Sequence, residues 1–230
     1  MPDWIKADLH VHTALSPCAE PEMTPRAIVA EALALGIRLL AVTDHQTAAN
    51  TAACLAAARG TALTVIPGIE VQTREDVHLV CLLPDERQMA DFSARIARAL
   101  PPSLTGRERF MASVSLTADE VCREAARCQG LVIAAHVERP FFSLLASLGF
   151  IPAGLPIAAL EIGTATDPAA FYRKHPDATA RPLVVSSDAH FLASLNKAKY
   201  SYFYLAEPVT LREIDKALRG EDGRKIKIDG

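Results

Sequence analysis

The sequence predicts a single α/β domain in which mostly parallel strands are wrapped by helices. Strand and helix signals alternate from residue 5 to residue 219, which is typical of barrel and doubly wound folds. The 230 residues, half of them hydrophobic, are enough to bury one such core. Histidines and carboxylates follow the apolar runs, where the reactive groups of barrel enzymes lie. No repeat or linker divides the chain, so we treat residues 1–230 as one domain.

The elements of the first half follow from apolar runs and helix caps. Four apolar runs predict strands, at residues 5–9, 39–43, 62–66 and 78–83. Thr24, Pro25 and Gly36 suit an N-cap, a first helical residue and a C-terminal stop, so a helix is expected between them. The alanine-rich residues 51–59 predict a second helix, which Gly60 ends.

The second half repeats this alternation. Apolar runs predict strands at residues 131–135, 158–162 and 183–186. Two threonine–glutamate pairs have the spacing of a capping box, Thr117 with Glu120 and Thr210 with Glu213. They predict helices that run toward Gly130 and Gly220, and residues 141–148 predict a short amphipathic helix between them.

Residues 84–116 interrupt the alternation. They begin as a charged helix over residues 85–100 and then become irregular at Pro101, Pro102 and Gly106. A long excursion between barrel elements is often a lid or a substrate-facing insertion. The equally weighted alternative is that these residues form a helical segment without a functional role.

Composition limits the partners and the location of the protein. The net charge of −3 provides no basic surface for long nucleic acid, although a few arginines and metal ions could hold a nucleotide. The five cysteines are Cys18, Cys54, Cys81, Cys122 and Cys128. Their irregular spacing, without a signal peptide before the first strand, predicts reduced thiols and a cytoplasmic protein. No apolar stretch approaches the ~20 residues of a membrane span.

Six of the seven histidines fall into short clusters with carboxylates. The clusters are His10 with His12, Asp44 with His45, Glu70 with His78, His136, and Asp188 with His190. Imidazoles and carboxylates from different strands can together replace the water shell of a divalent cation. A lone histidine is more often a surface or core residue, as we expect for His175, but five clusters together predict a multinuclear metal site.

Six motifs carry a resemblance to a known family. In order, they are Asp8-Leu9-His10-Val11-His12-Thr13, Thr43-Asp44-His45, Gly68-Ile69-Glu70, His78, Ala135-His136 and Ser187-Asp188-Ala189-His190. Together they resemble the polymerase and histidinol phosphatase (PHP) family of metal-dependent phosphoesterases, in its stand-alone type. The resemblance implies a distorted (β/α)7 barrel with two or three divalent ions, zinc, manganese or iron, at the carboxyl ends of its strands.

The resemblance also implies which side chains hold which ion. Grouped by ion, the implied ligands are His10, His12 and Asp188 for the first, His78 and His136 for the second, with Glu70 bridging these two, and His45 and His190 for the third. Some family members complete the third site with a histidine where this chain has Cys18. Cys18 is therefore either a thiolate ligand or a small buried residue of the loop.

Three further polar residues are candidates for roles around the ions. Asp44 is expected to accept a hydrogen bond that fixes an imidazole, with direct ligation as the alternative. Arg139, three residues after His136, is expected to pair with phosphate oxygens, unless it is an ordinary surface arginine. Glu161 could face the mouth of the barrel and is more simply a hydrogen-bond acceptor at its rim.

These residues predict a metal-dependent phosphoric ester hydrolase. Two cations lower the pKa of a shared water and neutralise charge on the attacking and leaving oxygens of a phosphate ester, so the nucleophile is a metal-bound hydroxide. The expected substrate is a small phosphomonoester or phosphodiester, such as a nucleotide or a phosphorylated metabolite. The alternatives are a PHP-type protein-tyrosine phosphatase and a non-catalytic, metal-binding regulatory protein.

Overall fold

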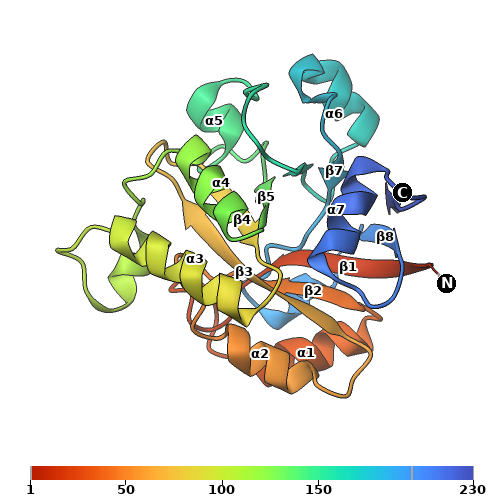
Figure 1. Cartoon of the computed structure of the whole chain (residues 1–230), viewed down its shortest axis with the longest axis horizontal. Coiled ribbons are helices and arrows are strands. Elements are labelled where there is room, and N and C mark those ends of the chain that lie inside the picture. The colour runs from red at the N-terminus through yellow and green to blue at the C-terminus, as the bar shows by residue number, and fades with distance from the viewer. Residues whose placement is uncertain (1, 198, 230) are drawn as a thin grey trace.

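The computed structural model describes residues 2–197 and 199–229. Within these residues, one sheet of nine strands has the order β7-β6-β5-β4-β3-β2-β1-β8-β9 (Figure 1). The strands are β1 (Asp3–Val11), β2 (Leu39–Val42), β3 (Thr64–Gln72), β4 (His78–Leu82), β5 (Leu131–Ala134), β6 (Ala159–Glu161), β7 (Leu183–Val184), β8 (Ser201–Leu205) and β9 (Lys225–Ile228). The α-helices are α1 (Pro25–Ala34), α2 (Thr51–Ala58), α3 (Glu86–Ala99), α4 (Ala118–Arg127), α5 (Leu144–Leu148), α6 (Pro168–Lys174) and α7 (Leu211–Arg219). Short 3-10 helices cover Gly106–Met111, Pro176–Ala178 and Leu192–Leu195.

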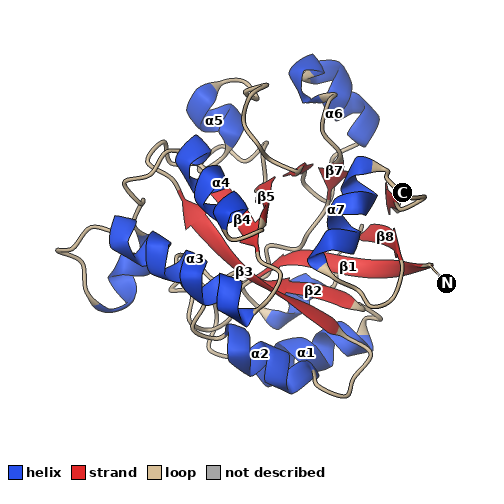
Figure 2. Cartoon of the chain, viewed as in Figure 1, coloured by secondary structure: helices blue, strands red, loops and turns tan. Residues whose placement is uncertain are grey.

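The sheet curls into a barrel-like shape, which a contact between β1 and the segment after β7 helps to close. Although β7 ends the hydrogen-bonding order of the sheet, Ala189 forms a parallel bridge with Val11 of β1. The His12 amide donates a hydrogen bond to the Ala189 carbonyl over 3.0 Å. Helices lie around the outside of the strands (Figure 2). The predicted α/β class and barrel-like sheet are therefore confirmed.

The sheet differs from the prediction in the number and direction of its strands. All seven predicted strands are present, but β8 and β9 extend the sheet beyond β1. Among the strands of residues 2–197 and 199–229, four of the eight pairings are antiparallel: β1 with β8, β3 with β4, β4 with β5, and β8 with β9. The mostly parallel order was wrong at β3 and β4 because only residues 73–77 join them, too few for a parallel crossover.

Apolar side chains fill the interior of the barrel beneath the polar end. Ile5, Ala7 and Leu9 of β1 pack in a buried cluster to which every strand from β2 to β8 also contributes. Leu211 and Ile214 of α7 belong to the same cluster, so this helix covers part of the interior core. The polar residues described below therefore lie next to a buried apolar core.

A β-bulge in β1 turns two successive side chains toward the interior. Between Asp8 and Val11, the register of β1 against β2 shifts by one residue. In a regular strand Leu9 and His10 would face opposite sides, but Leu9 packs in the interior core while His10 joins the polar cluster described below. Bulges next to functional sites re-aim side chains in this way.

The predicted caps of α1 and α4 are present, whereas the capping box predicted for α7 is half formed: the Thr210 hydroxyl accepts a hydrogen bond from the Glu213 amide, but the Glu213 carboxylate accepts from the Ala206 amide. The Thr24 side chain accepts a hydrogen bond from the Ala27 amide at the start of α1, and Thr117 with Glu120 forms the capping box of α4. Gly220, with φ of 67°, ends α7 in the left-handed conformation that glycine adopts without strain. In the described parts of the chain, none of the helices combines the length and the apolar character that crossing a membrane requires.

Residues 84–116 cross the outside of the barrel and return to its polar end. Helix α3 packs its buried face, which includes Phe92, against the outer face of the sheet. Farther along, the Arg107 guanidinium donates to the carbonyls of Ala14 and Ser16, over 3.1 and 3.2 Å. These carbonyls belong to the loop between β1 and α1, so the segment supports that loop. Its action as a lid stays a prediction.

Candidate metal centre

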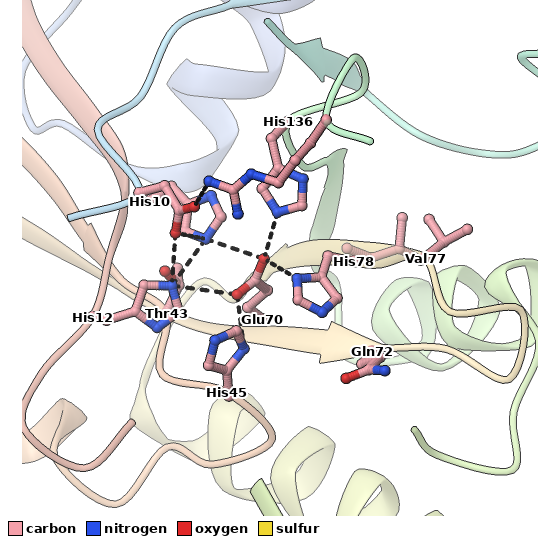
Figure 3. A network of polar contacts seen from close by, with 12 residues as sticks. His10, His12, Thr43, His45, Glu70, Gln72, Val77, His78 and His136 are labelled. Atoms are coloured by element: carbon pink, nitrogen blue, oxygen red, sulfur yellow. Dashed lines mark hydrogen bonds and ion pairs between the residues drawn. The ribbon is translucent and has the colours of Figure 1, made fainter. Parts of the chain in front are cut away.

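The predicted histidine and carboxylate ligands converge at one end of the barrel (Figure 3). They are His10 on β1, His12 directly after β1, His45 after β2, Glu70 on β3, His78 on β4, His136 after β5, and Asp188 and His190 after β7. Most of them lie at the carboxyl ends of their strands. His78 is the first residue of β4 but reaches the same end, because β4 runs antiparallel to β3. Residues spread over 180 positions therefore form one cluster, which we call the histidine cluster.

Glu70 lies at the centre of the histidine cluster and is fully buried. Its Oε2 is 2.9 Å from Nδ1 of His45, and its Oε1 is 2.9 Å from Nδ1 of His78 and 3.3 Å from Nε2 of His136. Burial by itself raises the pKa of Glu70, but the positive charges of His78, His10 and His45 outweigh it and hold the pKa well below its ordinary value. The carboxylate is therefore ionised and faces imidazoles on several sides.

His10 and His12 present the same ring atom to the centre of the cluster. Their Nε2 atoms are 3.1 Å apart and lie 3.3 and 3.1 Å from Oδ1 of Asp188. On the outer side, Nδ1 of His10 contacts both carboxylate oxygens of Glu161 at 3.2 Å, and Nδ1 of His12 lies 2.9 Å from Oγ of Ser16. Such outer contacts fix the orientation and tautomer of ligating histidines, leaving Nε2 for an ion.

His190 extends the cluster toward solvent. Its ring stacks on that of His12, with centroids 4.1 Å apart, and its Nδ1 contacts the Asp188 carbonyl over 2.8 Å. Among the described residues, three sets of potential ligand atoms lie within 4.8 Å of one another: His12, His45 and His190; His10, His12, Glu70 and Asp188; and His45, Glu70 and His78. The first two sets contain the ligands implied for the third and first ions, but the last joins His78 to His45, and His136 belongs to none of the three.

The donor set fits divalent ions because several buried atoms lie close to other ligand atoms and yet form no hydrogen bond with them. In the described structure, Oε2 of Glu70, both ring nitrogens of His78, Nδ1 of His136 and Oδ1 of Asp188 are buried without a hydrogen bond. Leaving such atoms unpaired costs roughly 1–3 kcal/mol each, and more when they are charged. Imidazole nitrogens and carboxylate oxygens are ligands of zinc, manganese and iron, so cations would satisfy the atoms that the protein leaves unpaired.

Asp44 supports the histidine cluster from behind. Its Oδ1 accepts from the Thr13 amide over 2.8 Å and from the Ser16 hydroxyl over 2.6 Å, and its Oδ2 accepts from the Thr13 hydroxyl over 2.6 Å. The expected contact with an imidazole is therefore indirect, since Ser16 lies between Asp44 and His12. Both oxygens are engaged in holding the loop after β1.

Arg139 lies beside the histidine cluster, and its pairing with phosphate oxygens stays a prediction. One of its terminal nitrogens donates to Oδ2 of Asp188 over 2.6 Å, and 47% of the side chain stays exposed. Glu161 is buried and accepts a hydrogen bond from the His136 amide over 3.1 Å, besides its contact with His10. Its role as an acceptor at the rim is thus borne out.

Cys18 and His175 lie outside the three ligand sets found in the described residues. Cys18 is exposed, so the alternative of a small buried residue is wrong. Burial lowers the pKa of His45, but the charge of Glu70 and a hydrogen bond with the Cys18 thiol outweigh it and raise the pKa. Cys18 is therefore close to the proposed third site, and ligation by it stays a prediction. His175 is half-buried beside Phe171 rather than fully on the surface.

Sequence reasoning missed one contributor to the site and one buried ion pair on the strand that leads to it. Ser16 contacts His12 and Asp44, yet a lone serine in a loop carries no signal of that role. Asp8 and Lys197 form a buried ion pair over 2.7 Å beneath the cluster. Asp8 lies two residues before His10 in the first motif, a position that could have suggested a role near the site. Nothing in the sequence, however, pairs it with Lys197.

The comparisons with known proteins agree with this arrangement. A family model described as "PHP domain" matches residues 8–216. A curated relative from Escherichia coli, the 5'-3' exoribonuclease Rnm, is 28% identical over 172 residues, which cover 63% of this chain and 56% of the relative. The chain thus spans about half the length of that relative. Among solved structures, the lesion-specific endonuclease PfuEndoQ from Pyrococcus furiosus has a TM-score of 0.77 at 22% identity, covering 97% of this chain and 58% of that one. PsfC from Pseudomonas syringae has a TM-score of 0.63 at 16% identity, covering 98% and 91%.

Proposed function

Since the chain belongs to the PHP domain family and is a phosphoesterase of that family, we propose that its substrate is a small phosphomonoester or phosphodiester, with nucleotides as the leading class. The observation that carries this proposal is the set of imidazole and carboxylate atoms that lie around the buried carboxylate of Glu70 without a hydrogen bond. In a purely structural network, such buried atoms would be hydrogen-bonded within the protein. A site for cations and a phosphate leaves them free.

In this proposal, the histidine cluster holds two or three divalent ions. As the sequence motifs imply, the proposed ligands are His10, His12 and Asp188 for one ion, His78 and His136 for another, with Glu70 between the two, and His45 and His190 for a third. Bound zinc, manganese or iron would acidify a water molecule and neutralise negative charge on the phosphate. Cys18 is proposed as a further ligand of the third ion.

The remaining side chains orient the ligands and the substrate. Glu161 and Ser16 contact the outer nitrogens of His10 and His12 and so fix both rings. Arg139 has five N–H donors, of which one is used on Asp188. Its exposed part can therefore bind a phosphate oxygen while it still holds Asp188, which makes it the proposed substrate-positioning residue.

The end of an RNA strand is a second candidate substrate. The E. coli relative is named a 5'-3' exoribonuclease, and the same chemistry cleaves a phosphodiester whether its nucleotide is free or terminal. The net charge of −3 gives no broad basic surface for tracking a long strand. We therefore expect short or terminal substrates to be preferred over internal positions of a duplex.

The proposal is tested with metal-loaded protein on a panel of phosphoesters. The panel contains nucleoside monophosphates, a short 5'-phosphorylated RNA, a phosphotyrosine peptide and a sugar phosphate. Glu70→Gln should lower turnover by about three orders of magnitude, since metal ions contribute several kcal/mol and each 1.4 kcal/mol is tenfold in rate. Glu86→Gln, at an exposed position at the start of α3, is the matched control.

Two results would overturn this function. Full metal occupancy without turnover of any member of the panel would favour the non-catalytic, metal-binding alternative. Preference for the phosphotyrosine peptide would favour the protein-tyrosine phosphatase.

A further inference from the structure

The loop of residues 136–143 carries three different kinds of side chain to the mouth of the site. His136 joins the histidine cluster, Arg139 holds Asp188, and Phe142 packs against His78. Hydrogen bonds within the loop fix its shape: the Arg139 amide donates to the His136 carbonyl over 2.8 Å, and the Ser143 hydroxyl donates to the Arg139 carbonyl over 2.6 Å.

Phe142 covers His78 with one face of its ring. The two rings are almost parallel, with centroids 4.9 Å apart and an angle of 13° between their planes, and the His78 amide donates to the Phe142 carbonyl over 2.9 Å. Even so, 41% of Phe142 is exposed, and the neighbouring Phe141 is 70% exposed. Since one face of the Phe142 ring lies on the imidazole, the exposure belongs to its opposite face and edge.

The backbone at Phe142 is strained. Its φ of 58° lies in the left-handed region that bulky side chains rarely adopt. His136 and Asp188, both in the histidine cluster, also have positive φ, of 30° and 50°. Strained residues gather at functional sites, where the fold retains them for the position of a side chain. Covering His78 alone would not require a second exposed aromatic ring beside the first.

The exposed side chains beside the cluster are Arg139, which belongs to this loop, and His190, which follows β7. His10, His12 and Glu70 are at most 1% exposed in their side chains, whereas His190 is 22% and Arg139 47% exposed. A substrate whose phosphate reaches the cluster therefore enters past Arg139. A planar group attached to that phosphate then comes within reach of the free face of Phe142.

We propose that Phe142, flanked by Phe141, is a stacking surface for the nucleobase of the substrate. This inference rests on the proposed function and narrows it, because a sugar phosphate or another substrate without a base would gain nothing from the ring. Every base offers a π face, so stacking on phenylalanine tolerates different bases while it excludes substrates that lack one. The site would then select nucleotides by an aromatic contact beside the ions.

The test compares adenosine 5'-monophosphate with ribose 5-phosphate on the metal-loaded protein. Phe142→Leu keeps an apolar cover on His78 but removes the π face. It should raise KM for the nucleotide about 5- to 150-fold more than KM for the sugar phosphate, the range that stacking of one base supplies. Phe142→Tyr retains a π face and should restore the preference. Phe150→Leu, at another exposed phenylalanine beyond α5, is the control and should leave the KM ratio unchanged.

A binding measurement separates stacking from general damage to the site. A 2-aminopurine nucleoside with a non-hydrolysable 5'-phosphonate should lose fluorescence on binding to the wild-type and Phe142→Tyr proteins, and much less with Phe142→Leu. An unchanged KM ratio in Phe142→Leu, or equal quenching by that variant, would overturn the stacking surface while leaving the phosphoesterase intact. Absence of turnover with these two substrates and with every other member of the phosphoester panel would instead overturn the proposed function.

Discussion

Two buried polar groups begin on the same strand and differ in how completely they are paired. Asp8 and His10 are two residues apart on β1, and both are fully buried. Asp8 meets Lys197 over 2.7 Å through one carboxylate oxygen and accepts a hydrogen bond from the Ser187 amide over 2.9 Å through the other. The Lys197 side chain is only 5% exposed. This pair is internally neutral and both carboxylate oxygens are satisfied.

The histidine cluster has the opposite character. Burial by itself raises the pKa of Glu161 and Asp188, but the charge of His10 and the neighbouring imidazole contacts outweigh it and hold both below their ordinary values. Yet Oδ1 of Asp188 and both ring nitrogens of His78 remain without a hydrogen bond. A buried polar group whose atoms are all hydrogen-bonded or ion-paired within the protein stabilises the fold. A buried polar group with atoms that lack a hydrogen bond indicates a binding site for a ligand. The two groups therefore respond differently to mutation and to metal.

Breaking the ion pair should produce the larger loss of stability. Lys197→Met leaves the Asp8 carboxylate buried without its counter-charge, which typically costs about 3–5 kcal/mol in the free energy of unfolding. The double variant Asp8→Asn with Lys197→Met should lose less, because no lone charge remains. Urea unfolding measures both. The loss should be equal with and without metal, and a loss that appears only in the metal-loaded protein would assign the pair to the site instead.

The contrast also shows what the sequence could reveal. Imidazoles and carboxylates at the ends of apolar runs can be identified from the sequence as one site, because parallel strands bring their carboxyl ends together. Each predicted strand is present. The Asp8–Lys197 pair joins residues 189 positions apart, and no local pattern encodes it. The bulge that turns both Leu9 and His10 inward is a register shift between two strands, which appears only when they are paired. The alternation of lysine and isoleucine over Lys225–Ile228 is also typical of a strand, although the sequence analysis predicted none there.

The next largest effect, on metal affinity, is expected at Glu161, which belongs to both kinds of polar group. This carboxylate is paired like Asp8 but acts on a member of the histidine cluster. Glu161→Gln keeps the shape of the side chain and weakens its hold on His10, so metal affinity should fall about 10- to 100-fold, as for other outer contacts of metal ligands. Competition with a chelator measures the affinity. Glu138→Gln, at an exposed glutamate, is the matched control and should leave the affinity unchanged.

The pH dependence of stability should separate the metal-free from the metal-loaded protein. Burial lowers the pKa of His10 and of His45, but Glu70 and further neighbours outweigh it and raise both. Their stabilising contribution is therefore complete below the ordinary histidine value of 6.5 and is lost as the pH rises through the raised values. Burial lowers the pKa of His78 below 6.5, so its contribution increases as the pH rises toward that value.

Metal-free protein should thus become less stable from pH 6.5 upward, by at most about 1.4 kcal/mol per pH unit for each proton lost. The metal-loaded protein should become more stable over the same range, because imidazoles bind ions only when deprotonated. Thermal unfolding with and without added zinc between pH 6.5 and about pH 8.5 measures both slopes. Slopes of the same sign would contradict the view that the histidine cluster binds ions.

The smallest effect is expected at Cys18, on the edge of the cluster. Here the comparison turns on whether an exposed residue beside the cluster is an ion ligand. Because this thiol is exposed while Glu70 is fully buried, its loss removes at most one ion and should lower activity about tenfold or less. Cobalt-substituted protein provides the direct measurement: a sulfur-to-cobalt charge-transfer band should be present in the wild type and absent in Cys18→Ala. Cys128→Ala, at a buried cysteine of the α4 end, should retain the band. A wild-type spectrum without the band would leave the third ion with nitrogen and oxygen ligands alone, and Cys18 would then be no ligand.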